Sequence, residues 1–254
     1  MSPLDYDILM EATFDVLYAG TSRRQAVVAA LPSPAGEALA GAFGPGFDQD
    51  VVRRRTRLSA DLLAALPVSF HAYYAQGGPA ALESLFDSHE WRHRRLVAGA
   101  LFPDPGSAVR AFVAFAGRTW IRSQAAWLRD AFRYEAQVCR ASAGLAPCAR
   151  PDLPHLPAQA WVSEATIDVP EVAAELSRRS REVPWDEALR LVKPRPVALA
   201  TVSIPLAERV RQVHLRDDEV DALRWAWTEA APVPSPSSPA WSTMERAVRA
   251  GILT

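Results

Sequence analysis

Residues 195–215 contain the clearest β-strand pattern in a sequence that otherwise favours helices, so this stretch most restricts the possible fold. Small and β-branched side chains alternate along residues 197–204, which predicts a strand able to bury both faces. Pro205 ends that strand, and residues 210–215 and 161–169 give two further strand patterns. Three short strands make a small sheet with edges. An edge is either covered by the protein or accepts an incoming strand.

The composition excludes several classes of protein. Of the 254 residues, 49% are apolar and 22% are charged, which allows a substantial core in one large domain or two modest ones. A net charge of −1 does not favour broad electrostatic capture of nucleic acid. Cys139 and Cys148 are too few for a disulfide framework or a cysteine zinc site. No membrane-spanning stretch and no signal peptide is recognised in the sequence, so we expect a cytoplasmic protein.

Prolines and glycines divide the chain into segments. Helical spacing begins at Ser2 and Pro3, Pro67 should kink a helix over residues 48–76, and residues 77–79 should break it. Residues 107–143 lack proline and predict one long helix. Four prolines between 147 and 157 predict an extended linker. We therefore expect an α+β protein with an all-helical domain over 1–146, a proline-rich linker over 147–160, and a small domain over 161–254 with a short mixed or antiparallel sheet.

Residues 89–93, HEWRH, match the H-E-x-x-H pattern of zinc hydrolases. His89 and His93 would share one helix face and hold Zn²⁺, with Glu90 acting on the bound water. The surrounding arginines place positive charge beside a dication, and the third histidine of the metzincin pattern is absent. A solvated helix face with Trp91 turned inward is the simpler interpretation, and a zinc-dependent hydrolase remains the alternative. Glu135 is the nearest downstream glutamate to complete such a site.

No other catalytic pattern is recognised. The sequence has no glycine-rich phosphate loop and no G-x-S-x-G motif, so we predict no catalytic residue and no metal site in this chain. Arginine clusters at 53–57, 92–95 and 178–181 are typical of solvated faces, and a nucleic-acid-binding regulator is the minor alternative that they leave open. The eight tryptophans are numerous for this length, and an exposed one would suit a partner surface.

Two runs carry a resemblance to a known family. They are LSADLLAALPVSFHAYYAQGGPAALESLFDSH at residues 58–89 and AAWLRDAFRYEAQVCRA at residues 125–141, the second containing a W-L-x-D-x-x-x-Y-E segment. With residues 4–31 they resemble the helical domain of partner proteins that accompany multinuclear non-haem iron oxidases in ribosomal-peptide biosynthesis, of the methanobactin and thiaglutamate type. The proline-serine stretch at 232–239 and the HEWRH run depart from that family.

The resemblance implies a non-catalytic subunit that binds a precursor peptide and docks onto a TIM-barrel iron oxidase. It implies no cofactor in this chain, with iron in the partner enzyme, and neither nucleic acid nor membrane as partners. The C-terminal part would accept the leader peptide as an added strand. That places the accepting edge at residues 197–204 or 210–215, flanked by a helix over 217–227. The implied peptide-binding residues are Val197, Leu199, Thr201, Val202, Val213, Leu215, Leu223 and Trp227.

Overall fold

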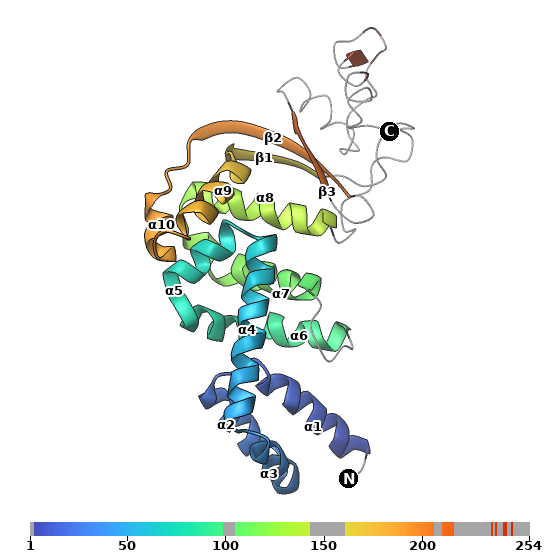
Figure 1. The fold of residues 1–254 in the computed structure, drawn as a ribbon. Coiled ribbons are helices and arrows are strands. Elements are labelled where there is room, and N and C mark those ends of the chain that lie inside the picture. Colours follow the sequence, from blue (N-terminus) through green and yellow to red (C-terminus); the bar gives the residue numbers. More distant parts are fainter. Residues whose placement is uncertain are drawn as a thin grey trace. The chain divides into compact units, whose positions relative to one another are not determined.

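The computed structural model describes residues 3–98, 105–142, 161–205 and 210–215, with a few isolated positions after 234. The chain is mostly helical and contains a small antiparallel sheet (Figure 1). It divides into two compact units, Met1–Trp120 and Ile121–Thr254. The predicted linker at 147–160 lies outside the described residues. The helix just before it, residues 126–142, belongs to the same unit as the strands.

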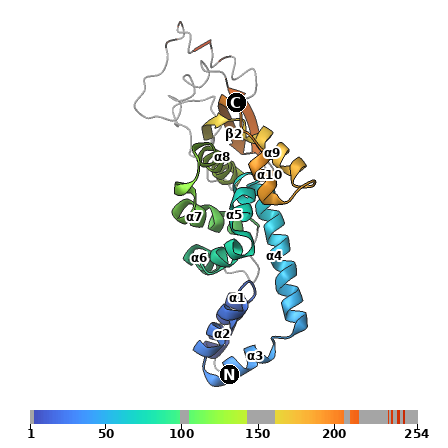
Figure 2. The ribbon, with the colours of Figure 1, turned by 90° about the vertical axis from the view of Figure 1, so that its left-hand side faces the viewer.

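The described part of the first unit is helical throughout. Its helices are α1 (Pro3–Val16), α2 (Thr21–Ala30), α3 (Ser33–Gly41), α4 (Pro45–Ala65), α5 (Ser69–Phe86), α6 (His89–Ala98) and α7 (Pro105–Thr119). Within this unit, α4 is the longest helix and leads from the α1–α3 group to α5 (Figure 2). Buried side chains of α1, α2 and α3 form one core cluster: Ala12, Val16, Val27 and Leu39.

Proline and glycine set the helix ends as predicted. The helical run that starts at Pro45 stops before Pro67, which lies between α4 and α5. Within α5 the helix is interrupted at Gly78, whose φ of 54° and ψ of −143° lie outside the helical region. An L-residue with a side chain rarely adopts a positive φ, so glycine is required there. The predicted breaks at Pro67 and at residues 77–79 are confirmed.

The predicted single helix over residues 107–143 is wrong. α7 ends at Thr119, a short 3₁₀ turn follows at Ile121–Ser123, and α8 runs over Ala126–Ser142. No proline or glycine marks the break. At its start, the Trp120 ring packs edge-on against Tyr73 at 5.5 Å, and the indole N–H donates to Gln76 Oε1 at 2.9 Å. These contacts to α5 hold Trp120 at the end of the helix.

The second unit contains α8, β1 (Trp161–Ile167), α9 (Val169–Arg179), α10 (Trp185–Leu191), β2 (Pro196–Pro205) and β3 (Val210–Leu215). All three predicted strands are confirmed, and they form an antiparallel sheet in the order β1-β2-β3. α8 lies along the strands (Figure 1), and Asp130 Oδ2 of α8 accepts a hydrogen bond from the Thr166 hydroxyl of β1. This bond joins the helix directly to the sheet.

The start of α9 is fixed by a side-chain cap. Asp168 is the N-cap residue, and its carboxylate accepts a 3.0 Å hydrogen bond from the Glu171 N–H. Such a cap satisfies one of the free donors in the first helical turn. Val169, Val172 and Leu176 are buried at the helical spacing of one apolar stripe. α9 is therefore anchored by that stripe, and its remaining faces carry the charged residues.

Candidate functional site

The order of the strands decides which of them is an edge. β2 lies between β1 and β3, and along residues 200–203 it pairs with both neighbours. Thr201, for example, lies opposite Ser163 on one side and His214 on the other. The stretch of β2 over residues 200–203 therefore has no free edge. In the described part of the sheet, β3 is an outer strand, as is β1, which the sequence did not single out as an edge.

Six of the eight residues implied as a peptide site lie on the neighbouring strands β2 and β3, where Val202 pairs directly with Val213. Four of them lie on β2, where Leu199 pairs with Ala165 of β1, and Val197 is an exposed apolar side chain at 37%. Val213 and Leu215 lie on the outer strand β3. Leu223 and Trp227 lie outside the described residues. Among the residues of the implied site, only Val213 and Leu215 are both described and located on an outer strand of the described sheet.

The two outer strands differ in how well they would accept another strand. β1 has a register shift between Ala165 and Ile167, and it carries the exposed carboxylate of Glu164. Bulges and charges are the usual means by which proteins block an edge. β3 carries one charged residue, Arg211, but it keeps a regular register with β2 over its whole length. Its regularity makes β3 the better strand-accepting edge in the described part of the sheet.

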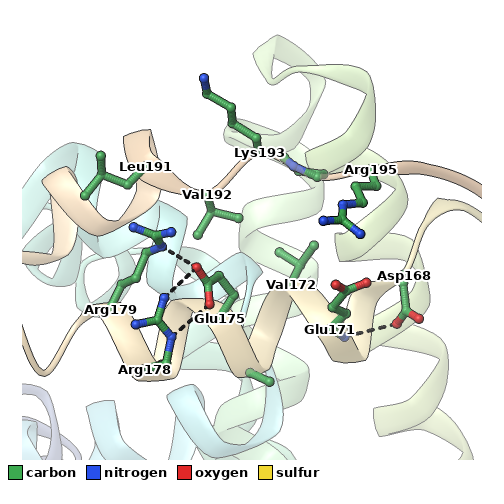
Figure 3. Close-up of a pocket in the computed structure, with 12 residues that line it drawn as sticks. Asp168, Glu171, Val172, Glu175, Arg178, Arg179, Leu191, Val192, Lys193 and Arg195 are labelled. Carbon is green, nitrogen blue, oxygen red and sulfur yellow. Dashed lines mark hydrogen bonds and ion pairs between the residues drawn. The ribbon is translucent and has the colours of Figure 1, made fainter.

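A groove of about 610 Å³ lies beside the sheet, between α9 and the segment that leads from α10 into β2 (Figure 3). One wall is a charged face of α9. The other wall is residues 191–195, which connect α10 to β2 and include Lys193, the only lysine of the chain. The resemblance did not point to this groove. Its sequence signal is the K-P-R-P run, in which prolines prevent a helix and alternate with cations.

The α9 wall contains a tightly paired carboxylate. Glu175 accepts hydrogen bonds from Arg178, at 2.9 Å from Nη2, and from Arg179. Arg178 also pairs with Glu182 at 3.2 Å. The hydrogen bonds from Arg178 and Arg179 lower the pKa of the Glu175 carboxyl, which therefore stays ionised at neutral pH. Since Glu175 and Glu182 together balance the two arginines, the positive charge left at this end of the groove is that of Lys193.

The HEWRH run lies on α6, where its side chains make packing and ion-pair contacts typical of a helix with a structural role. The rings of His89 and His93 are stacked with centroids 5.6 Å apart. The Glu90 carboxylate pairs with Arg118 of α7 at 2.7 Å, and Trp91 is 3% exposed, as predicted for the inward position. Among the described residues, no group of three or more metal-ligating side chains comes together. The carboxylate required as a general base is thus held by an arginine, and the zinc alternative gains no support from this geometry.

Some arginines of the three clusters lie on solvated faces, and others do not. Arg53 and Arg57 are exposed, as predicted. Arg55 is different, because its guanidinium donates to the carbonyl of Tyr18 and pairs with Glu83 of α5. A side chain that links three segments has a structural role. The sequence gives no sign of it, since the partners lie 37 and 28 positions away.

Cys139, on α8, is a poor nucleophile. Burial, together with the nearby carboxylate of Glu135, raises the pKa of its thiol to about 12. Because the thiolate is the reactive form, the reactive fraction at pH 8 is very small. In a Cys148→Ser variant, we expect iodoacetamide at pH 8 to modify Cys139 at least about a hundredfold more slowly than free cysteine. Modification at the rate of free cysteine in the folded protein would contradict this, and unfolding in guanidinium should restore that rate.

Comparison of the chain with protein-family models and with curated proteins finds no match. Among the helices that the structure describes, none combines the length and the apolar character needed to cross a bilayer. The sheet, the groove and the sequence resemblance are therefore the features that indicate a function.

Proposed function

We propose that this chain is a non-catalytic partner subunit that binds a ribosomally made precursor peptide and docks it onto a multinuclear iron-dependent oxidase. The observation that carries the proposal is the outer position of β3 in the described part of the sheet, together with its regular register. The sequence resemblance supplies the class of peptide and the class of enzyme. In this proposal the peptide-recognition domain over residues 161–254 lies in the unit Ile121–Thr254, which also contains α8, and the unit Met1–Trp120 holds the other helices of the predicted helical domain.

Strand addition explains how such a site binds a long peptide. The backbone N–H and C=O groups of an extended peptide pair with those of an edge strand, which provides affinity without a particular sequence. Alternate side chains then provide specificity. In the sequence of β3, Val213 and Leu215 are apolar residues at alternate positions. A peptide with apolar residues at alternate positions would place them beside these two side chains.

The proposed division of labour leaves the iron chemistry with the partner enzyme. This chain would bind the leader part of the peptide and hold the segment to be modified near the oxidase. Binding two parts of one ligand raises the effective concentration of the second part to the millimolar range for a short flexible connection. A subunit that acts in this way needs no catalytic residue of its own.

The proposal is tested first by purifying the tagged full-length protein from its native host. We expect an iron-containing TIM-barrel enzyme and a short peptide to co-purify, identified by mass spectrometry and metal assay. The purified protein alone should not convert the peptide, whereas the protein together with the enzyme should. Elution without an iron enzyme, with one zinc per chain that is lost in His93→Ala, would overturn the proposal in favour of the hydrolase.

The position of the bound peptide gives a sharper prediction. A photo-reactive benzophenone residue at His214, which is exposed on β3, should crosslink the co-purified peptide. The matched control places the same residue at Glu164, which is exposed on the other outer strand. We expect at least about tenfold more crosslinked peptide at position 214, because strand addition holds the ligand against one edge. Equal yields at the two positions, or a higher yield at 164, would contradict binding at β3.

A further inference from the structure

We propose that the groove between α9 and residues 191–195 is a second contact for the same kind of ligand, an extended peptide segment that carries a carboxylate at Lys193. The inference rests on the proposed function only in naming the precursor peptide as the source of that segment. Three features of the groove support the inference: its charges, its free backbone donors and its apolar floor.

The segment before β2 presents donors that the described structure does not use. Lys193 and Arg195 are exposed, and neither side chain forms an ion pair or hydrogen bond within the described part of the chain. Their backbone N–H groups likewise bond to no described residue. Pro194 and Pro196 have no N–H. The backbone N–H groups of Lys193 and Arg195 are therefore two residues apart, which is the spacing of the donors along one edge of an extended strand. An extended peptide can pair with such a row of donors.

The charges differ along the groove. At the Lys193 end, Arg178 and Arg179 line the opposite wall, and the nearby carboxylate of Glu175 is already bound by both of them. At the other end Arg195 lies opposite Glu171 (Figure 3). The unneutralised positive charge is therefore concentrated at Lys193. A carboxylate is the complementary group, because an ammonium ion and a carboxylate in a partly enclosed groove attract each other more strongly than in open water.

The apolar part of the groove suits a peptide better than a small anion. Val172 and Val192 are buried at 5% and 8% and lie in the lining, whereas Leu191 next to Lys193 is 43% exposed. An exposed leucine beside a cation can contact an apolar side chain of the ligand while the amine binds the carboxylate. A segment that alternates acidic and apolar residues meets both requirements.

Because Lys193 is the only lysine, a carbodiimide can test the contact directly. The reagent joins a carboxylate to an amine that touches it, and apart from the N-terminal amine this chain offers a single amine. The probe is an acetylated, amidated decapeptide that alternates glutamate and valine, and its control has glutamine for glutamate. We expect the glutamate peptide to be joined to Lys193, found by mass spectrometry. Coupling at the N-terminal amine alone would overturn the inference.

Binding of the two labelled peptides to the full-length protein provides the second readout, measured by fluorescence anisotropy at low salt. The glutamate peptide should bind at least about tenfold more tightly than the glutamine peptide, and Lys193→Glu should remove that difference. The matched control is Arg190→Glu, which changes the net charge equally at an exposed residue that does not line the groove. It should bind within about twofold of the unchanged protein, since exposed pairs contribute little.

The outcomes separate this inference from the proposed function. If Lys193→Glu binds the glutamate peptide as well as the unchanged protein does, or the unchanged protein does not bind it at all, the groove is not an acidic-peptide site. Co-purification of the iron enzyme would then still stand. If instead no iron enzyme co-purifies but the coupling to Lys193 and the loss in Lys193→Glu are observed, the groove inference holds and the proposed partner is wrong. Lys193→Ala, which only truncates an exposed side chain, should show a smaller loss in the same direction.

Discussion

Replacing Phe112 by alanine should lower the free energy of unfolding of the first unit by about 3–5 kcal/mol, as is usual when a buried phenylalanine is truncated. Phe112 of α7 is 0% exposed. Its ring meets Phe70 edge-on at 5.4 Å and Tyr73 edge-on at 5.3 Å, so one side chain joins α7 to α5. Truncation removes apolar burial, leaves a cavity in the aromatic cluster, and removes both ring contacts.

Urea unfolding followed by tryptophan fluorescence measures this loss, because Trp120 packs against the same Tyr73. The matched control is Val52→Ala on α4, where the side chain is 62% exposed. We expect its effect to stay within about 0.5 kcal/mol, as for most surface substitutions. A loss below about 1 kcal/mol for Phe112→Ala would mean that the site collapses to fill the cavity, and that the aromatic cluster does not hold α5 against α7.

Glu83→Ala should destabilise the first unit by about 1–3 kcal/mol, the second-largest effect that we expect. Glu83 of α5 accepts a hydrogen bond from the Gly20 N–H at 3.0 Å and pairs with Arg55 of α4. Without it, Arg55 keeps its hydrogen bonds to the Tyr18 carbonyl and its position over the Phe86 ring, but loses its carboxylate partner. The estimate is well below that for a fully buried pair, because the Glu83 side chain is 36% exposed and solvent screens the lost attraction.

Glu83→Gln and Asp50→Ala separate the parts of this effect. Glutamine keeps an acceptor but loses the charge, so its loss should fall between zero and that of alanine. Asp50 pairs with Arg54 on the surface of α4 at 46% exposure, and its removal should cost no more than about 0.5 kcal/mol. All three variants are compared by urea unfolding. If Glu83→Ala lowers the free energy of unfolding no more than Asp50→Ala does, the contacts of Glu83 with Arg55 and Gly20 contribute no more than an exposed ion pair.

The glycine at position 20 belongs to the same contact. A Cβ at Gly20 would lie 2.7 Å from Glu83 Oε2, closer than such atoms approach. The sequence predicts that Gly20 ends the first helix, but α1 ends at Val16 and Gly20 is the N-cap residue of α2. The structure adds a second requirement, because the carboxylate of a residue 63 positions away packs against it. A glycine that appears to serve a local turn is thus also needed for a tertiary contact.

Local features were the most predictable part of the fold. The breaks at Pro67 and at residues 77–79, the Ser88 cap of α6 and all three strands follow from turn residues, caps and alternation within a few positions. The break after Thr119 was missed, because it depends on Trp120 reaching Tyr73 and Gln76 on another helix. Helical propensity over residues 107–143 depends on local sequence only and therefore cannot indicate that contact.

The candidate site was less predictable. Alternating residues at 197–204 and 210–215 correctly indicated two strands, but not that β2 lies in the middle of the sheet. Alternation describes which faces a strand can bury and contains nothing about its neighbours. The groove was missed for a similar reason: Lys193 lines the same groove as Arg178 and Arg179 only because α10 and the segment after it return along α9.

The sequence by itself determined the elements of this protein: where most helices begin and end, where the strands lie, and which short runs carry charge. Those features depend on the backbone limits of proline and glycine and on periodic burial, which act over a few residues. Only the tertiary structure decided that β3 is an edge, that Glu90 is occupied by Arg118, and that Lys193 lines a groove. Each of these depends on which segments meet in space, and pairing over tens of residues is selected by packing of the whole unit and not by local preference.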